Sequence, residues 1–380
     1  MSVFASIAVP AELREAVCER AWLEAMLDAE RALANAESLA GVIPPAAAAA
    51  IAEQCDPDRY AWDELVAQAR TVGNPAEPLV RALRDAVGAE ARFVHYGATS
   101  QDIVDTAAML VARRALDLIV PDLDGAIAAA AELARRYRST SAAAWTLLQP
   151  AVPTTFGFRG ALWLTGLLDA RADLRSIEPA AQLGGAAGTL APLGDAGPEI
   201  VRLYAAELDL AAPDVPWHAN RWRIARLGAA LDAAAAAAAK SAVDVVLLSS
   251  FGEVEEAEPG GSSTMPHKRN PVGSVLARAC AIQVHAAASM LGGRDHELER
   301  AAGAWHAEWD ALSTALALTG GAAAGIRGVL EGLRVDEERL RENLSNELLA
   351  GRLAFGLEGP YPGSAETFVD RAIARYEAER

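Results

Sequence analysis

A twelve-residue block in the second half of the chain concentrates side chains that could carry chemistry. Residues 260–271 contain two glycines, three hydroxyls, an imidazole, two cations and an amide. Glycines allow a backbone to approach a ligand closely. A serine could carry a proton, and Lys268 and Asn270 could donate hydrogen bonds to a developing oxyanion. Composition alone fits a solvated surface loop equally well.

Two further blocks hold polar side chains at places where they could bind a ligand. Residues 95–102 end where a helical pattern begins, and Thr99 and Asp102 have the spacing of a capping box. Capping alone explains this spacing, although the free N–H groups of a helix start also bind anions. Thr146 and Gln149 are polar residues in an apolar stretch, where Gln149 could as easily cap a helix end.

Helices must position these blocks, because the composition favours an all-α fold. Only 6% of the residues are aromatic, and alanine, the best helix former, is abundant. Apolar residues three and four apart predict a helix from Asp102 that Pro121 ends or kinks, followed by a second helical run over 123–137. Helices are also predicted over 160–174 and 224–250. The last is apolar on most sides, which indicates burial in a bundle or between subunits.

Charge and cysteine content exclude several classes of protein. The chain has 34 Lys and Arg against 51 Asp and Glu, a net charge of −17, which argues against a nucleic-acid partner. No apolar run reaches the roughly 18 residues of a membrane span, and no signal peptide is recognisable. Three scattered cysteines fit reduced thiols, and the histidines lack a metal-binding spacing. We therefore expect a cytoplasmic protein without membrane contact, metal or cofactor.

Residues 261–271 resemble the signature of the fumarase/aspartase superfamily, GSSxMPxKxNP, at every defined position. Residues 95–106 resemble the first shared region of that superfamily, and residues 146–149 resemble the second, in the same chain order. Within it, the sequence is most similar to the family of bacterial 3-carboxy-cis,cis-muconate cycloisomerases. Four short segments support this likeness: Gly73–Pro75, Pro78–Val80, Pro216–His218 and Trp305–Trp309.

The resemblance implies a central bundle of long helices flanked by two smaller helical domains. It predicts an N-terminal helical domain over 1–97, the bundle over 98–335 and a shortened C-terminal helical domain over 336–380. It also implies a homotetramer that acts on a small polycarboxylate, with active sites that combine the three regions from different subunits.

Site residues follow from the resemblance, position by position. Ser262 takes the place of the proton-transferring serine, and Lys268 and Asn270 match the pair that stabilises a carboxylate. The positions expected to bind substrate are His95, Thr99, Ser100, Thr146, Gln149, Ser263, Met265 and His306. Trp145 replaces an arginine that is common at the start of the second region, so one anion contact is missing.

Two other absences indicate which chemistry is used. Hydrating and deaminating members have a histidine where this chain has Leu147, and pair it with a glutamate where this chain has Val275. Superfamily reactions pass through an aci-carboxylate, and expelling hydroxide or an amine from it benefits from a general acid. A carboxylate leaving group is already stable at neutral pH. Closing a lactone by adding a carboxylate to a double bond therefore needs one proton carrier, Ser262.

The leading hypothesis is thus a lactone-forming cycloisomerase of aromatic-compound degradation. The main alternative is a superfamily lyase that eliminates another stable anion from a substituted succinate to give fumarate. Adenylosuccinate lyase shares the first region but uses the missing His and Glu. A catalytically inactive relative, like the superfamily's crystallins, fits poorly with the intact set Ser262, Lys268 and Asn270.

Overall fold

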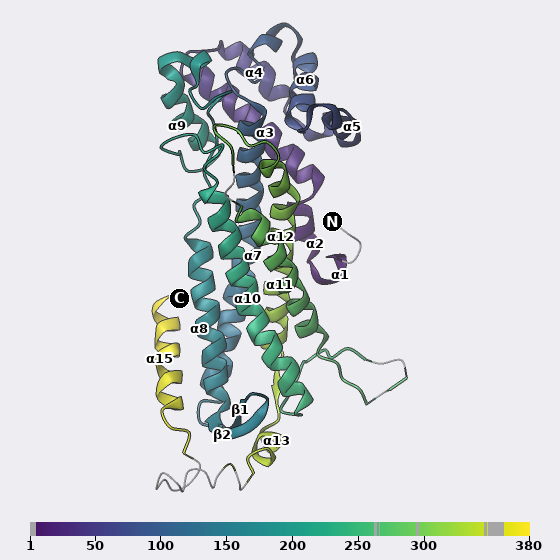
Figure 1. The fold of residues 1–380 in the computed structure, drawn as a ribbon, viewed down its shortest axis with the longest axis vertical. Helices are drawn as coiled ribbons and strands as arrows, with labels where there is room; N and C mark the ends of the chain where they lie inside the picture. Colours follow the sequence, from purple (N-terminus) through teal and green to yellow (C-terminus); the bar gives the residue numbers. More distant parts are fainter. Residues whose placement is uncertain (1–4, 262–263, 266, 294–295, 346–347, 349–360) are drawn as a thin grey trace.

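Five long helices run along the length of the molecule and form its core (Figure 1). The computed structural model describes residues 5–261, 264–265, 267–293, 296–345, 348 and 361–380. The bundle helices are α7 (Ser100–Arg136), α8 (Phe156–Arg175), α10 (Trp222–Ser250), α11 (Val272–Leu291) and α12 (Ala304–Glu331). The all-α class and the central bundle are as predicted, and the helices expected over 160–174 and 224–250 lie within α8 and α10.

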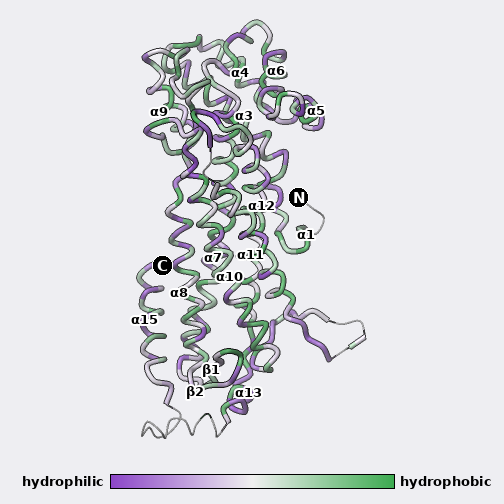
Figure 2. Tube along the Cα trace, in the orientation of Figure 1, coloured by the Kyte–Doolittle hydropathy of each residue, from purple (hydrophilic) through white to green (hydrophobic). Residues whose placement is uncertain are grey.

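Small side chains let these helices pack closely. Ala107, Ala112, Ala115, Ala126 and Ala130 on α7 are all fully buried. Alanine loses no side-chain entropy in a helix, so a face of alanines combines helix formation with close approach. Figure 2 shows hydrophobic residues spread along α10, α11 and α12. α11 has the length and hydropathy of a membrane span, although 39% of its apolar window is already buried against the rest of the chain.

The two helical runs predicted on either side of Pro121 form one helix. α7 continues through Pro121 to Arg136, so of the two expected effects of this proline, an end or a kink, the helix end does not occur. Pro121 itself is exposed, and water can solvate the carbonyl group that its missing N–H leaves free. Ile119 and Leu123 are fully buried on either side of it. Their packing holds the helix together across the proline.

A second group of helices covers the upper end of the bundle, where α7 begins (Figure 1). α3 packs on α7, and α9, which comes much later in the chain, packs on α3. The helices that precede α7 or lie at this end are α1 (Ala5–Ala8), α2 (Ala11–Ala16), α3 (Glu19–Leu39), α4 (Pro45–Gln54), α5 (Trp62–Val72), α6 (Ala76–Val87) and α9 (Gly197–Glu207). The division into three domains at residues 97 and 335 stays a prediction.

The lower end of the bundle carries two small antiparallel pairs of strands. β1 (Ser141–Thr146) and β2 (Gln149–Thr155) form a hairpin in which Thr146 lies opposite Gln149. The two turn residues, Leu147 and Leu148, have φ values of 52° and 61°, a conformation that usually selects Asn or Gly. β3 (Val254–Glu255) pairs with β4 (Arg334–Val335).

The C-terminal segment lies against the bundle. α13 (Glu337–Glu342) follows β4, and α15 (Ala365–Ala378) packs along α8. Arg138, just after α7, donates hydrogen bonds to Asp370 at 2.6 and 2.7 Å and forms an ion pair with Glu366. These contacts tie α15 to the lower half of the bundle.

A buried ionic network joins three of the long helices near the upper end. Arg221, at the start of α10, donates from both Nη atoms to Asp105 of α7 at 2.7 and 2.9 Å. Its Nε donates to Glu308 of α12 at 3.1 Å. The three side chains are only 2–6% exposed. The guanidinium pairs with both carboxylates, and Glu308 also lies 3.2 Å from Nε2 of the buried His296. Such pairing matters because a buried charge without a partner is costly.

Replacing the central cation tests how much this network contributes. We expect Arg221→Met to lower the free energy of unfolding by about 3–5 kcal/mol, because the buried carboxylates of Asp105 and Glu308 lose the guanidinium that pairs with both. Urea denaturation followed by circular dichroism measures the loss. Arg202→Met is the matched control: Arg202 pairs with Glu199 at the surface, where the side chains are 60% and 53% exposed. Equal free energies of unfolding for the two variants would show that the network does not stabilise the fold.

Candidate active site

Part of the predicted site assembles at the upper end of the bundle. His95, Thr99 and Ser100 lead into the N-terminus of α7, and His306 lies in the first turn of α12. Trp305 Nε1 donates to Asp105 Oδ1 at 2.9 Å and so fixes the start of α12 against α7. We call the group His95, Thr99, Ser100, Arg300 and His306 the upper site.

Asp102 fixes the backbone beneath the upper site. Its fully buried carboxylate accepts the backbone N–H groups of Thr99, Gly184 and Gly185, each at 2.9 Å. It also lies 2.6 Å from His218 Nε2. The capping role predicted from the sequence is confirmed, and the same carboxylate additionally holds a glycine loop and a histidine from distant parts of the chain. The N-terminus of α7 is therefore rigidly placed.

Arg300 is a candidate site residue that the sequence patterns did not indicate. Its Nη1 donates to Thr99 Oγ1 at 2.8 Å, and its side chain is part-buried. In the sequence it stands in a charged stretch that is typical of a solvated loop. The sequence nevertheless held one indication of a role in the site. Arg300 lies only five residues before Trp305–Trp309, a segment that supports the family resemblance. The guanidinium adds a cation beside a helix N-terminus, which already favours anions.

His95 is held by a buried carboxylate. Its Nδ1 lies 2.6 Å from Glu30 Oε1 of α3, with the two side chains 11% and 1% exposed. Burial lowers the pKa of His95, but the charge and hydrogen bond of Glu30 outweigh it, so the pKa lies above its ordinary value. The imidazole therefore holds its second proton more firmly than an ordinary histidine does, and Nε2 is the ring nitrogen left for a ligand.

The second region lies at the other end of the same helix. Thr146 and Gln149 flank the turn of the β1–β2 hairpin and are exposed. α7 has 37 residues, which at 1.5 Å per residue separates its two ends by about 55 Å. One chain therefore does not bring Thr99 and Thr146 together.

The described residues of the signature block, 260–261, 264–265 and 267–271, lie to the side of the bundle (Figure 1). Ser262 and Ser263, the predicted proton carrier and its neighbour, lie outside the described residues. Met265 and Lys268 are exposed. The loop is closed at its base, where Gly260 and Asn270 exchange backbone hydrogen bonds of 2.8 and 2.9 Å. Asn270 is thus held in place, although no described contact joins this loop to the upper site.

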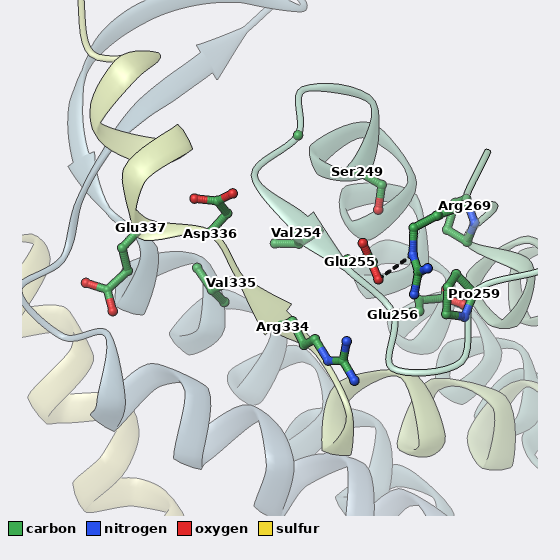
Figure 3. A pocket seen from close by; sticks show the side chains of 12 residues that line it. Ser249, Val254, Glu255, Glu256, Pro259, Arg269, Arg334, Val335, Asp336 and Glu337 are labelled. Carbon is green, nitrogen blue, oxygen red and sulfur yellow. Dashed lines mark hydrogen bonds and ion pairs between the residues drawn. The ribbon is translucent and has the colours of Figure 1, made fainter. Parts of the chain in front are cut away.

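A cavity of about 550 Å³ lies at the base of the loop (Figure 3). Glu255 and Arg269, which form an ion pair at 2.6 Å, line it together with Arg334 from β4. Glu256, also in the lining, accepts the backbone N–H groups of Gly273 and Ser274 at 3.0 and 2.9 Å and so caps α11. None of the predicted site residues that the structure describes lines this cavity. The contacts among its lining residues hold the base of the loop in place.

Trp145 makes structural contacts within the chain, where an arginine would have offered a contact to an anion. It stacks on Phe251 with ring centroids 4.0 Å apart, and its Nε1 donates to Glu253 at 3.3 Å. Arg159 of α8 lies nearby but pairs with the same Glu253 at 2.9 Å. Its charge is therefore already neutralised.

Comparison with known proteins places the chain among lyases. A family model described as Lyase matches residues 7–286. A 3-carboxy-cis,cis-muconate cycloisomerase of Bradyrhizobium diazoefficiens is 43% identical, over 97% of this chain and 86% of its own. A nitrosuccinate lyase of Streptomyces davaonensis is 44% identical, over 96% of this chain and 81% of its own. The crystal structure of 3-carboxy-cis,cis-muconate lactonizing enzyme from Pseudomonas putida matches with a TM-score of 0.90 and 32% identity, covering 99% of both chains.

The upper site should bind a carboxylate through Arg300. We expect Arg300→Met to weaken the binding of tricarballylate by roughly 10- to 100-fold, because a hydrogen bond to a charged group contributes about 1.5–3 kcal/mol. Isothermal titration calorimetry measures the affinity. Arg202→Met removes the same charge from an exposed position on α9 and should bind like the unaltered chain. Unchanged affinity in Arg300→Met would remove this residue from the site.

Proposed function

The chain belongs to the lyase family of the fumarase/aspartase superfamily, and we propose that it converts 3-carboxy-cis,cis-muconate to a lactone as a cycloisomerase. The observation that carries this proposal is an intact superfamily signature in a chain that lacks both halves of the acid–base pair. Leu147 and Val275 occupy those two positions. The named cycloisomerase relatives, at up to 43% identity over most of the chain, support the same activity.

The proposed reaction needs one protein proton carrier. In the forward direction a substrate carboxylate adds to a double bond, and the neighbouring carbon takes a proton from Ser262. In the reverse direction Ser262 removes that proton, an aci-carboxylate forms, and the ring carboxylate leaves. Lys268 and Asn270 would stabilise the two negative charges of the aci-carboxylate. The leaving group is a stable anion, so no second acid is required.

The cations of the proposed site match a substrate with three carboxylates. Arg300 and His95 would meet carboxylates at the start of α7, where the helix dipole adds to their field. Lys268 would meet the carboxylate next to the reacting carbon. A net charge of −17 opposes an anionic substrate at long range. Salt screens that repulsion beyond roughly 8 Å, so the local cations dominate inside the site.

We propose a cytoplasmic homotetramer in which each site draws on several chains. Two observations support shared sites: the two ends of α7 carry different site residues, and α11 exposes large apolar side chains. Those exposed side chains on α11 are Val272, Val275, Ile282 and Met290. Leu147, at the hairpin turn, is 97% exposed. Partner helices would cover these groups and bring a hairpin and a loop to the upper site of another chain.

Elimination of nitrite from nitrosuccinate is the second candidate. A nitrosuccinate lyase is 44% identical to this chain, which is as near as the cycloisomerase relative. Nitrite is also a stable anion, so its departure needs no general acid either. The same proton carrier and the same aci-carboxylate would serve, and the product would be fumarate.

Two assays separate these reactions. With 3-carboxy-cis,cis-muconate we expect the ultraviolet absorbance of the conjugated diene to fall, and with nitrosuccinate we expect little nitrite. We expect Ser262→Ala to lower kcat by at least about 10²-fold while substrate affinity changes little, since the serine moves a proton. Ser364→Ala is the control, because Ser364 is exposed at the start of α15 and its side chain makes no capping hydrogen bond. Rapid nitrite release with an unchanged diene would replace the first candidate by the second.

Mixing two inactive variants tests the shared site. Thr99→Ala and Lys268→Ala alter residues that should reach one site from different chains, so each homo-oligomer should be inactive. Oligomers co-expressed with two different affinity tags and purified on both should regain a measurable part of the activity. Native mass spectrometry confirms that the chains have mixed. Mixed oligomers without activity would show that both residues of a site come from one chain.

A further inference from the structure

The backbone at His95 is held in an unusual conformation that aims the side chain at α3. His95 has a φ of 59°, in the left-handed region that residues other than glycine rarely occupy. Such backbone strain persists only where the surroundings fix it. Arg84 of α6 donates to the carbonyl of the preceding Val94 at 3.2 Å. Gly97 follows at a φ of 71°, packed on Leu193. His95 is therefore locked in place from both sides.

Among the described residues, His95 is the group that forms an ion pair with Glu30, and no lysine or arginine does. Glu30 lies on α3, is 1% exposed, and its second oxygen, Oε2, has no hydrogen-bond partner in the described part of the chain. The charged groups that act on His95 are Glu30 from α3, Asp102 from α7 and Arg84 from α6. Asp102 is already engaged by His218 and three backbone N–H groups. The charge of His95 thus depends mainly on Glu30.

A second buried glutamate on the same helix provides a contrast. Glu37 lies seven residues, or two helical turns, after Glu30 and is fully buried. Neither of its carboxyl oxygens has a partner among the described residues. Burial, and secondly the charge of Glu30, raises the pKa of Glu37 to about 9, so this side chain is a neutral acid near pH 7. Replacing Glu37 by glutamine would change no charge.

We propose that Glu30 is a positioning residue of the upper site, which keeps His95 protonated and turns its Nε2 toward a carboxylate of the substrate. The role of the carboxylate is indirect, since the imidazolium makes the contact. The identity of the substrate rests on the proposed function, whereas the coupling between Glu30 and His95 does not.

The pairing of His95 with Glu30 sets the direction in which affinity for a carboxylate changes with pH. A carboxylate ligand binds the protonated form of His95, so affinity is present at low pH and is lost as the pH rises through the pKa of His95. In the unaltered chain Glu30 raises that pKa. Without the charge of Glu30, burial alone acts and lowers it. The loss of affinity should then begin at a lower pH.

Calorimetric titration with tricarballylate over a range of pH tests the proposal. Glu30→Gln should weaken binding by roughly 10-fold or more at neutral pH and move the pH curve to lower values, because a charged contact contributes at least about 1.5 kcal/mol. Glu37→Gln, the matched control on the same helix, should keep the affinity and the pH curve of the unaltered chain. Circular dichroism checks that each variant is folded.

A double substitution separates positioning from a general structural role. His95→Gln should abolish this pH dependence, and adding Glu30→Gln to it should cost no further affinity. The proposal is overturned if Glu30→Gln keeps the original pH curve, or if it weakens binding equally in the His95→Gln background. If Glu30→Gln does not fold, the His95→Gln variant decides alone. The proposal is then overturned if the affinity of His95→Gln for tricarballylate depends on pH as in the unaltered chain. A shifted curve in a chain that turns over neither substrate would contradict only the proposed function.

Discussion

The length of α7 is the constraint on which the arrangement of the site depends. This single helix carries the first region at its N-terminus and delivers the second region just beyond its C-terminus, about 55 Å away. A helix cannot shorten, so the two regions meet only if another chain supplies one of them. Buried alanines along α7 allow neighbouring helices to approach closely, and the exposed apolar side of α11 remains to be covered. The bundle that builds the fold thus supports the proposed site, in which the two regions come from different chains.

The cationic side chains have different partners inside the bundle and at the start of α7. Inside the chain, cations are paired with carboxylates: Arg221 with Asp105 and Glu308, and Arg159 with Glu253. These pairs hold helices and the hairpin in place. At the start of α7, Arg300 contacts a neutral hydroxyl, and His95 has one ring nitrogen bound to Glu30. At this end of the bundle the acidic protein thus offers the guanidinium of Arg300 and the second ring nitrogen of His95 to a ligand.

Local sequence patterns predicted the parts of the structure that local forces decide. The helical spacing located α8 and α10, and the Thr99–Asp102 spacing located the cap of α7. The helix does not end at Pro121 because buried neighbours outweigh one missing hydrogen bond on an exposed face. The hairpin was missed because Leu147 and Leu148 occupy turn positions that usually carry Asn or Gly. Arg300 was missed because only the folded chain brings it, across some 200 residues, to Thr99.

The central claim is that one substrate is bound by residues from different ends of the bundle in different chains. A crystal structure of the oligomer with tricarballylate bound would test it most directly. The account predicts that Thr99 and Arg300 of one chain and Lys268 and Asn270 of another contact the same ligand, with Ser262 next to its central carbon atoms. A ligand enclosed by residues of a single chain, or bound away from the start of α7, would contradict it.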